Sequence, residues 1–227
     1  MLHLLREAIS GLADLLLPQH CVGCDVAGTA WCSVCAGRLG GFRRVHRPLL
    51  GDAPPVFALG RYRGAARRAV LAYKESGQRA LAGPLAGQLA TALRSITAEE
   101  SLEREWWLVP APSRAVASRR RGGAHMARIA RSAAVALSDS GFPAQVADCL
   151  LTGPGAADSA GLTPQQRLDN LSGRVLVRPR GLPPEGAQIA LLDDVVTTGA
   201  TVASAVSTLD GVRRPVTAVL ALTATAG

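Results

Sequence analysis

The stretch LLDDVVTTGAT, residues 191–201, decides the fold that we expect for this chain. Asp193 and Asp194 directly follow an apolar run, and three threonines then surround Gly199. Ligands of open α/β sheets bind beyond the carboxyl ends of the strands. The amides and the dipole of a helix that starts at such a turn attract an anion. The stretch therefore predicts a buried strand, a phosphate-binding turn and a helix.

The rest of the chain alternates in the same way. Apolar runs that predict strands alternate with segments of helical period, an order typical of parallel strands joined by crossover helices. Strands are predicted at 56–62, 106–112, 144–151, 188–195 and 215–226, and helices at 67–73, 81–96, 123–137 and 198–209. We expect an α/β fold with a doubly wound, mostly parallel sheet.

Two phosphate-binding motifs are absent from the sequence, and their absence narrows the class of ligand that the turn is expected to bind. The sequence contains neither G-x-x-x-x-G-K-[ST] nor G-x-G-x-x-G, which argues against a nucleoside triphosphate or a dinucleotide held in those ways. Two carboxylates beside a phosphate need hydroxyls or a metal as partners. A ribose 5-phosphate would give its hydroxyls to Asp193 and Asp194 and its phosphate to the turn. The alternative is a capped helix after a buried strand, with incidental acids.

Four of the five cysteines stand in CVGCDVAGTAWCSVC, residues 21–35. The spacing C-x2-C-x7-C-x2-C lets the thiolates of Cys21, Cys24, Cys32 and Cys35 converge on one tetrahedral ion, for which Zn²⁺ is preferred. Four protein ligands leave no position for water, so the predicted zinc is structural. Disulfides and an iron–sulfur cluster are the alternatives. Cys149, alone in an apolar run, is expected to be a buried small hydrophobe.

The chain is expected to divide into three parts. Residues 1–40 hold an N-terminal helix and the cysteine module, 41–55 form a linker rich in proline, glycine and arginine, and 56–227 form the main domain. Charges interrupt the apolar spacing of the first helix, so we expect neither a signal peptide nor a membrane span. A cytoplasmic protein is predicted, with this helix packed on the body.

Positive charge is concentrated in two segments. The formal net charge is +8, and residues 38–79 hold ten Arg and Lys against two acids. A second arginine cluster, in residues 114–131, contains no acid. Such clusters attract the phosphates of a nucleic acid or of a small substrate, and an arginine-rich solvated surface is the other interpretation.

Residues 191–201 resemble the phosphoribosyl pyrophosphate (PRPP) loop of type I phosphoribosyltransferases. VPAPSR (109–114) with RRRG (119–122) resembles the pyrophosphate-loop region of the ComF (GntX-like) family, and TPQQRLDNL (163–171) resembles another segment of that family. Together with the cysteine module and AYKESGQRALAGPLA (72–86), the resemblance to a ComF-family protein covers nearly the whole chain.

The resemblance implies roles for individual residues. Asp193 and Asp194 would bind the ribose hydroxyls, and Mg²⁺ would accompany PRPP. The residues that would wrap the 5-phosphate are Thr197, Thr198, Gly199, Ala200 and Thr201. The pyrophosphate would lie near Ala111, Pro112 and Ser113, with Arg114 and Arg121 as candidates to neutralise it.

The chain departs from the family pattern in two places. RGGAH (121–125) lacks the aromatic residue and the Asn that commonly follow the family's Arg-Gly, and His125 is expected on the surface of the next helix. The segment 152–166, where type I enzymes close a loop with basic residues, has Asp158 as its only charge. No residue stands out as a base, so the catalytic residues are unknown and turnover stays an open question.

Two functions follow. The first is a Mg²⁺-dependent PRPP- or ribose 5-phosphate-binding protein, whose enzymatic form would transfer the phosphoribosyl group to an unknown acceptor. The second, implied by the family, is a nucleic-acid-binding accessory factor of DNA uptake (competence). In that function single-stranded DNA, or the uptake machinery, is the partner, and the strand would follow Arg38, Arg43, Arg44 and Arg47. The sequence predicts no oligomeric state.

Overall fold

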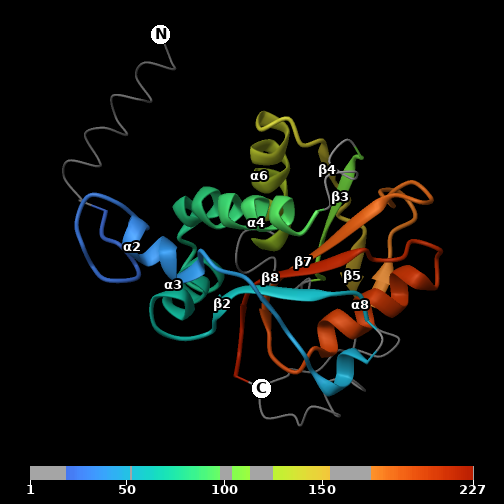
Figure 1. Ribbon diagram of the computed structural model, residues 1–227, viewed down its shortest axis with the longest axis horizontal. Coiled ribbons are helices and arrows are strands. Elements are labelled where there is room, and N and C mark those ends of the chain that lie inside the picture. The colour runs from blue at the N-terminus through green and yellow to red at the C-terminus, as the bar shows by residue number, and fades with distance from the viewer. Residues whose placement is uncertain (1–18, 52, 98–103, 113–124, 154–174, 227) are drawn as a thin grey trace.

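The computed structural model describes residues 19–51, 53–97, 104–112, 125–153 and 175–226 (Figure 1). The strands are β1 (Arg43–Arg44), β2 (Val56–Arg61), β3 (Trp106–Pro110), β4 (Ala144–Val146), β5 (Leu150–Thr152), β6 (Val175–Val177), β7 (Gln188–Val196) and β8 (Ala218–Ala224). The α-helices are α2 (Ser33–Ala36), α3 (Gly64–Lys74), α4 (Ala82–Ile96), α6 (His125–Asp139) and α8 (Ala200–Asp210). Short 3₁₀ turns are η1 (Gly37–Leu39), η2 (Pro48–Leu50) and η3 (Arg79–Leu81).

The main sheet has six strands in the order β1-β2-β8-β7-β3-β4. β1 is antiparallel to β2, and every other neighbouring pair is parallel. Helices connect the parallel strands along the chain, with α3 and α4 before β3, α6 before β4 and α8 before β8. The predicted α/β class with a mostly parallel sheet is confirmed.

The two faces of the sheet carry separate cores. On β7, Ala190 and Leu192 face a core built with α3, α4 and α6, whereas Ile189 and Leu191 face one built with α8 and η2. Side chains alternate between the faces of a strand, so β7, buried along nearly all its length, needs apolar residues on both. Figure 1 shows α4 and α6 on one side of the sheet and α8 on the other. The sheet is therefore doubly wound, as predicted.

The prediction of a single strand at 144–151 was wrong. β4 pairs with β3 in the main sheet, while β5 pairs antiparallel with β6 in a separate two-stranded sheet. Ala147 N still donates to Leu108 O of β3, whereas Cys149 O accepts from Arg178 N, which follows β6, so the chain changes its partner between Ala147 and Cys149. Because the run packs against a core in both sheets, it is apolar in both, and the sequence does not show where the chain passes from one sheet to the other. β6 and the two-residue β1 were not predicted.

The helices bury stripes of small and aliphatic side chains. Buried positions of α6 recur at helical spacing at Ile129, Ala133 and Leu137, and α4 packs beside it through Leu85, Leu89 and Leu93. No helix in the described ranges is both long and apolar enough to cross a membrane. The predicted first helix lies outside the described residues.

Candidate functional site

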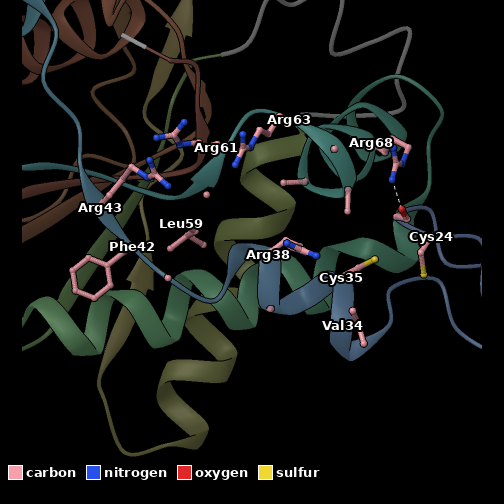
Figure 2. A pocket seen from close by; sticks show the side chains of 17 residues that line it. Cys24, Val34, Cys35, Arg38, Phe42, Arg43, Leu59, Arg61, Arg63 and Arg68 are labelled. Carbon is pink, nitrogen blue, oxygen red and sulfur yellow. Dashed lines mark hydrogen bonds between the residues drawn. The ribbon is translucent and has the colours of Figure 1, made fainter.

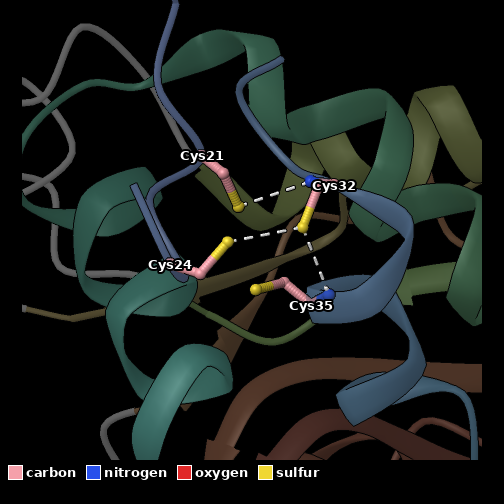
Figure 3. Close-up of side chains that lie close together, drawn as sticks. All are labelled: Cys21, Cys24, Cys32 and Cys35. Carbon is pink, nitrogen blue, oxygen red and sulfur yellow. Dashed lines mark hydrogen bonds between the residues drawn. The ribbon is translucent and has the colours of Figure 1, made fainter. Parts of the chain in front are cut away.

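The four clustered cysteines converge, as their spacing predicted (Figure 3). Their four sulfur atoms all lie within 4.8 Å of one another, and Cys24 Sγ is 3.6 Å from Cys32 Sγ. With Zn–S bonds of about 2.3 Å, a tetrahedral site places its sulfurs about 3.8 Å apart. All five cysteines are free thiols, so disulfides are not formed. The donor set and its spacing fit Zn²⁺.

Backbone amides of the cysteine loop point at the sulfurs. Cys32 N donates to Cys21 Sγ at 3.4 Å, and Cys35 N donates to Cys32 Sγ at 3.5 Å where α2 begins. Burial raises the pKa of Cys21, but amide hydrogen bonds, first from Cys32, outweigh burial and lower it to about 6. Burial raises the pKa of Cys35 to about 12. The amides thus favour the metal-binding thiolate at Cys21.

Gly23 makes the close approach of this loop possible. A Cβ there would lie 2.5 Å from Cys35 Sγ and 2.9 Å from the Trp31 ring. Trp31 is buried in the same core as α3 and α4, and the Arg68 guanidinium of α3 donates to Gly23 O. The cysteine module is therefore anchored on the main domain by both packing and hydrogen bonding.

The second candidate site lies at the carboxyl end of β7, which extends beyond the end of the neighbouring strand β3. β3 ends at Pro110, and Ala111 N donates to Leu192 O, so the acids that follow on β7 have no β3 strand beside them. Asp193 and Asp194 are both buried, each with 7% of its surface exposed. The predicted ligand-binding end of the strand is thus where the sheet narrows.

Asp194 is held by two basic side chains. Its Oδ2 lies 2.7 Å from Lys74 Nζ and 2.8 Å from His125 Nε2, at the end of α3 and the start of α6. Burial raises the pKa of its carboxyl, but the hydrogen bond from His125 and the charge of Lys74 outweigh burial and hold that pKa well below its usual range. Asp194 is ionised and faces the side of the sheet that carries α3 and α6.

Asp193 has the opposite environment. Adjacent residues of a strand point to opposite faces, so its side chain shares the face of Leu191. Its Oδ1 accepts from Asp194 N at 2.8 Å. Burial, with the negative charge of Asp194 next to it, raises the pKa of Asp193 to about 7. The two predicted ribose ligands therefore start from different charge states.

The prediction that His125 lies on the surface was wrong. Its side chain is buried, it bonds Asp194, and its backbone carbonyl accepts from Tyr73 Oη at 2.9 Å. Its Nδ1 is buried without a partner among the described residues. The helical spacing of the sequence could have predicted this burial. His125 stands four residues before Ile129, on the buried stripe that continues to Ala133. Lys74, counted only as part of a basic cluster, was missed as well.

The turn at 197–201 has the features of the predicted anion site. Gly199 has φ of 87°, in the left-handed region, and precedes α8 as its N-cap. A Cβ at Gly199 would lie 2.9 Å from two carbons of Leu50. The first turn of α8 contains no acid, and Gly199, having no side chain, gives no capping bond. The α8 amides thus start beside Thr197 and Thr198, which are exposed and partly exposed.

Arg47 ties this turn to the sheet. Its Nε donates to Thr197 O and its Nη2 to Thr225 O, both at 2.6 Å, and its Nη1 donates to His46 O. The segment 41–55, predicted as a linker, therefore supplies two supports of the turn, Arg47 and Leu50. If Arg47 were to bind a DNA strand, as predicted, it would have to give up these three hydrogen bonds.

Other predicted residues are placed in part. Ala111 is buried beside Leu192, and Pro112 follows it, at the same edge as the acids. Ser113, Arg114 and Arg121 lie outside the described residues, as do 154–174, so their roles stay predictions. Cys149 is fully buried, as expected, and burial raises its pKa to about 11.

No family model matches this chain, and no curated protein matches it. Among solved structures, it is similar over 65% of its length to a glutamine mutant from an analysis of an invariant aspartic acid in HPRTs, at 16% identity and a TM-score of 0.35. It is similar over 65% of its length to Trypanosoma cruzi hypoxanthine phosphoribosyl transferase, at 13% identity and a TM-score of 0.34. It is also similar over 63% of its length to L. donovani hypoxanthine-guanine phosphoribosyl transferase, at 16% identity and a TM-score of 0.32.

The matched regions cover 66%, 64% and 64% of those three solved chains. At TM-scores this low the likeness decides nothing about this chain. Its fold class rests on its own strand order, and membership of the ComF family stays a prediction from the sequence motifs.

Proposed function

We propose that this chain binds a ribose 5-phosphate ligand, PRPP or a compound with the same ribosyl phosphate, at the turn 197–201. The observation that carries the proposal is Gly199, a left-handed N-cap packed against Leu50, which starts α8 in the turn that follows two buried carboxylates. Ala200 N donates to Thr198 Oγ1 at 3.4 Å, so a bound phosphate would compete with that hydroxyl for the first amide. The hydroxyls of Thr197, Thr198 and Thr201 would donate further hydrogen bonds to the 5-phosphate. The resemblance of residues 191–201 to a PRPP loop is the reason for proposing ribose as the sugar.

The two acids would not contribute equally to binding the hydroxyls of the sugar. Asp194 offers Oδ1, because Oδ2 is taken by Lys74 and His125. Asp193 is the acid that gains most from a donor, since burial raises its pKa and a ribose hydroxyl would stabilise its ionised form. We propose Asp193 as the main ribose ligand and Asp194 as the second.

Mg²⁺ fits this donor set. Carboxylate and phosphate oxygens are its preferred ligands, and it commonly keeps several waters. Asp193 and the pyrophosphate of PRPP would hold it, and the bound ion would neutralise charge that develops on the leaving pyrophosphate. Ala111 and Pro112, with the predicted Ser113, Arg114 and Arg121, would lie near that group.

An enzymatic form would displace pyrophosphate from the anomeric carbon of the ribose, with an acceptor nucleophile entering as the pyrophosphate leaves. Lys74 and His125 are engaged with Asp194, so neither is assigned as a base. We therefore assign no catalytic residue and propose the binding function first, with phosphoribosyl transfer as its extension.

Isothermal titration with PRPP and with ribose 5-phosphate, with and without Mg²⁺, tests the binding function. We expect Thr198→Val combined with Thr201→Val to weaken the affinity at least about tenfold, because each lost hydroxyl removes a hydrogen bond to a charged phosphate. Thr91→Val on the exposed surface of α4 is the matched control and should bind normally. Asp193→Ala with Asp194→Ala should abolish binding. No binding of either ligand, or affinities unchanged in the variants, would refute the proposal.

The nucleic-acid function has less support from the geometry. Arg38 and Arg43 line one groove, whereas Arg44 and Arg47 line another cavity, and Arg47 is also bonded to the turn at 197–201. The four arginines therefore do not form one track for a strand. DNA uptake and a cytoplasmic location stay predictions from the family resemblance and the sequence.

We also propose that Zn²⁺ occupies the cysteine cluster in a structural role. The support is the donor set of four sulfurs with their spacing and the two amides that point at them.

A further inference from the structure

A groove of about 760 Å³ lies between the cysteine module and the β1–β2–α3 region (Figure 2). It is lined by arginines and by no acidic side chain: Arg38, Arg43, Arg61, Arg63 and Arg68. None of its lining residues belongs to the turn 197–201 or to the acids of β7. The groove is thus separate from the proposed ribosyl-phosphate site, and its volume falls in the range of small-molecule pockets.

The positive charge of this groove has no acidic partner in the described part of the chain. None of these five arginines forms an ion pair with a described acid. Arg68 donates to the Gly23 carbonyl, which is a neutral acceptor. Guanidinium groups gathered in a concave surface repel one another and raise the local concentration of anions. A ligand with several negative charges would offset this repulsion.

The charge is not uniform along the groove. Cys24 and Cys35 form the end of the groove beside Arg68 and Arg38, and with the proposed Zn²⁺ the four thiolates would carry a net charge of about −2. Those two arginines offset the thiolates. Figure 2 shows Arg43 and Arg61 at the end of the groove away from the cysteines, where Phe42 also lies, and Arg63 between Arg61 and Arg68. The first turn of α3, which has no acidic residue, lines the same groove. The free positive field is therefore at the Phe42 end.

Phe42 gives this end an aromatic platform. Its side chain is 45% exposed, although it packs edge-to-face against Phe57 with ring centroids 5.6 Å apart. The ring is held by Phe57 and still open to a ligand, and an exposed ring beside arginines suits a stacked base. Phosphates and a planar base are the two parts of a nucleotide.

We infer that the groove binds a nucleoside di- or triphosphate, with its phosphates on Arg43, Arg61 and Arg63 and its base on Phe42. A longer strand is disfavoured because, at the Arg68 end, its phosphates would meet the thiolates of Cys24 and Cys35, which line the groove there. The ligand is therefore one that ends within the groove. This site is additional to the ribosyl-phosphate site and does not depend on it.

Titration of the full chain with ATP tests the inference. We expect Arg61→Ala with Arg63→Ala to weaken ATP binding at least about tenfold, because two charge-assisted contacts are lost. Phe42→Leu should weaken ATP but leave inorganic triphosphate unchanged, since only the base uses the ring. Arg94→Ala with Arg180→Ala, two exposed arginines outside the groove, is the matched control. ATP binding should also survive Thr198→Val with Thr201→Val, which separates the two sites.

Three results would overturn the inference: no ATP binding, an equal loss in the control variant, or a twelve-nucleotide DNA strand that binds more tightly than ATP and is lost in the same variants. The last result would assign the groove to a strand. Thermal unfolding of each variant verifies its fold, and Arg61→Gln with Arg63→Gln replaces the alanine pair if that pair unfolds.

Discussion

Asp193 and Asp194 are neighbours on one strand, but their carboxyl groups have pKa values shifted in opposite directions because they face opposite sides of the sheet. Asp194 faces Lys74 and His125 and is held ionised, whereas Asp193 is buried beside the charge of Asp194 and holds its proton more tightly. The sequence predicts both acids as candidate site residues, because they end an apolar run. It could not predict their inequality, which depends on two helices brought together only by the fold.

Asp193 and Asp194 should therefore affect stability in opposite directions. The raised pKa of Asp193, about 7, means that the folded state binds a proton that the unfolded state releases near pH 4, so stability falls as the pH rises from about 4 to 7. Asp193→Asn should remove this fall and raise the free energy of unfolding at pH 8 by about 1 kcal/mol or more. Urea unfolding between pH 4 and 8 measures it.

Asp194→Asn is the matched comparison. Its lowered pKa contributes stability above about pH 4 that is lost as the pH falls. Substitution should reduce stability at neutral pH, because Lys74 and His125 lose their anionic partner. Equal effects of the two asparagine variants would contradict the assigned charge states.

At the scale of elements, apolar runs and helical periods located most strands and helices because burial on both faces of the sheet demands them. The run at 144–151 shows the limit, since β4 and β5 are equally apolar but pair in different sheets. The segment 41–55 shows another limit. Its proline, glycine and arginine content indicates a linker, but Arg47 and Leu50 support a turn 150 residues later in the chain. Long-range contacts of this kind leave no local pattern.

Arg47→Ala should loosen the turn at 197–201. The variant loses the bonds to Thr197 O and Thr225 O, which together contribute about 1–3 kcal/mol. We expect a lower free energy of unfolding by that amount and a weaker affinity for PRPP, because the α8 amides would no longer be held in place. Chemical unfolding and titration measure the two effects. Arg44→Ala, three residues earlier and exposed on β1, should change neither. Loss of PRPP affinity in Arg44→Ala as well would mean that charge, not positioning, is responsible.

At the scale of the whole molecule, the cysteine module and the main domain share one hydrophobic core. Cys21, Trp31 and Cys35 are buried together with residues of α3, α4 and α6. Sequence spacing predicted that the four cysteines converge, but not that the module packs on the sheet's helices. A protein built in this way should lose its module and its domain together, because neither surface is stable in water without the other.

Removal of the metal should therefore lower the stability of the whole chain rather than release a separate unit. We expect one zinc per chain by mass spectrometry of the metal content. A strong chelator should lower the temperature of a single unfolding transition, since binding free energy is coupled to folding. Cys24→Ser, at the exposed ligand, should lose zinc and reproduce this shift, whereas Cys149→Ala, in the other core, should keep its zinc. Visible absorption near 400 nm would indicate an iron–sulfur cluster instead. Two separate transitions after chelation would contradict the shared core.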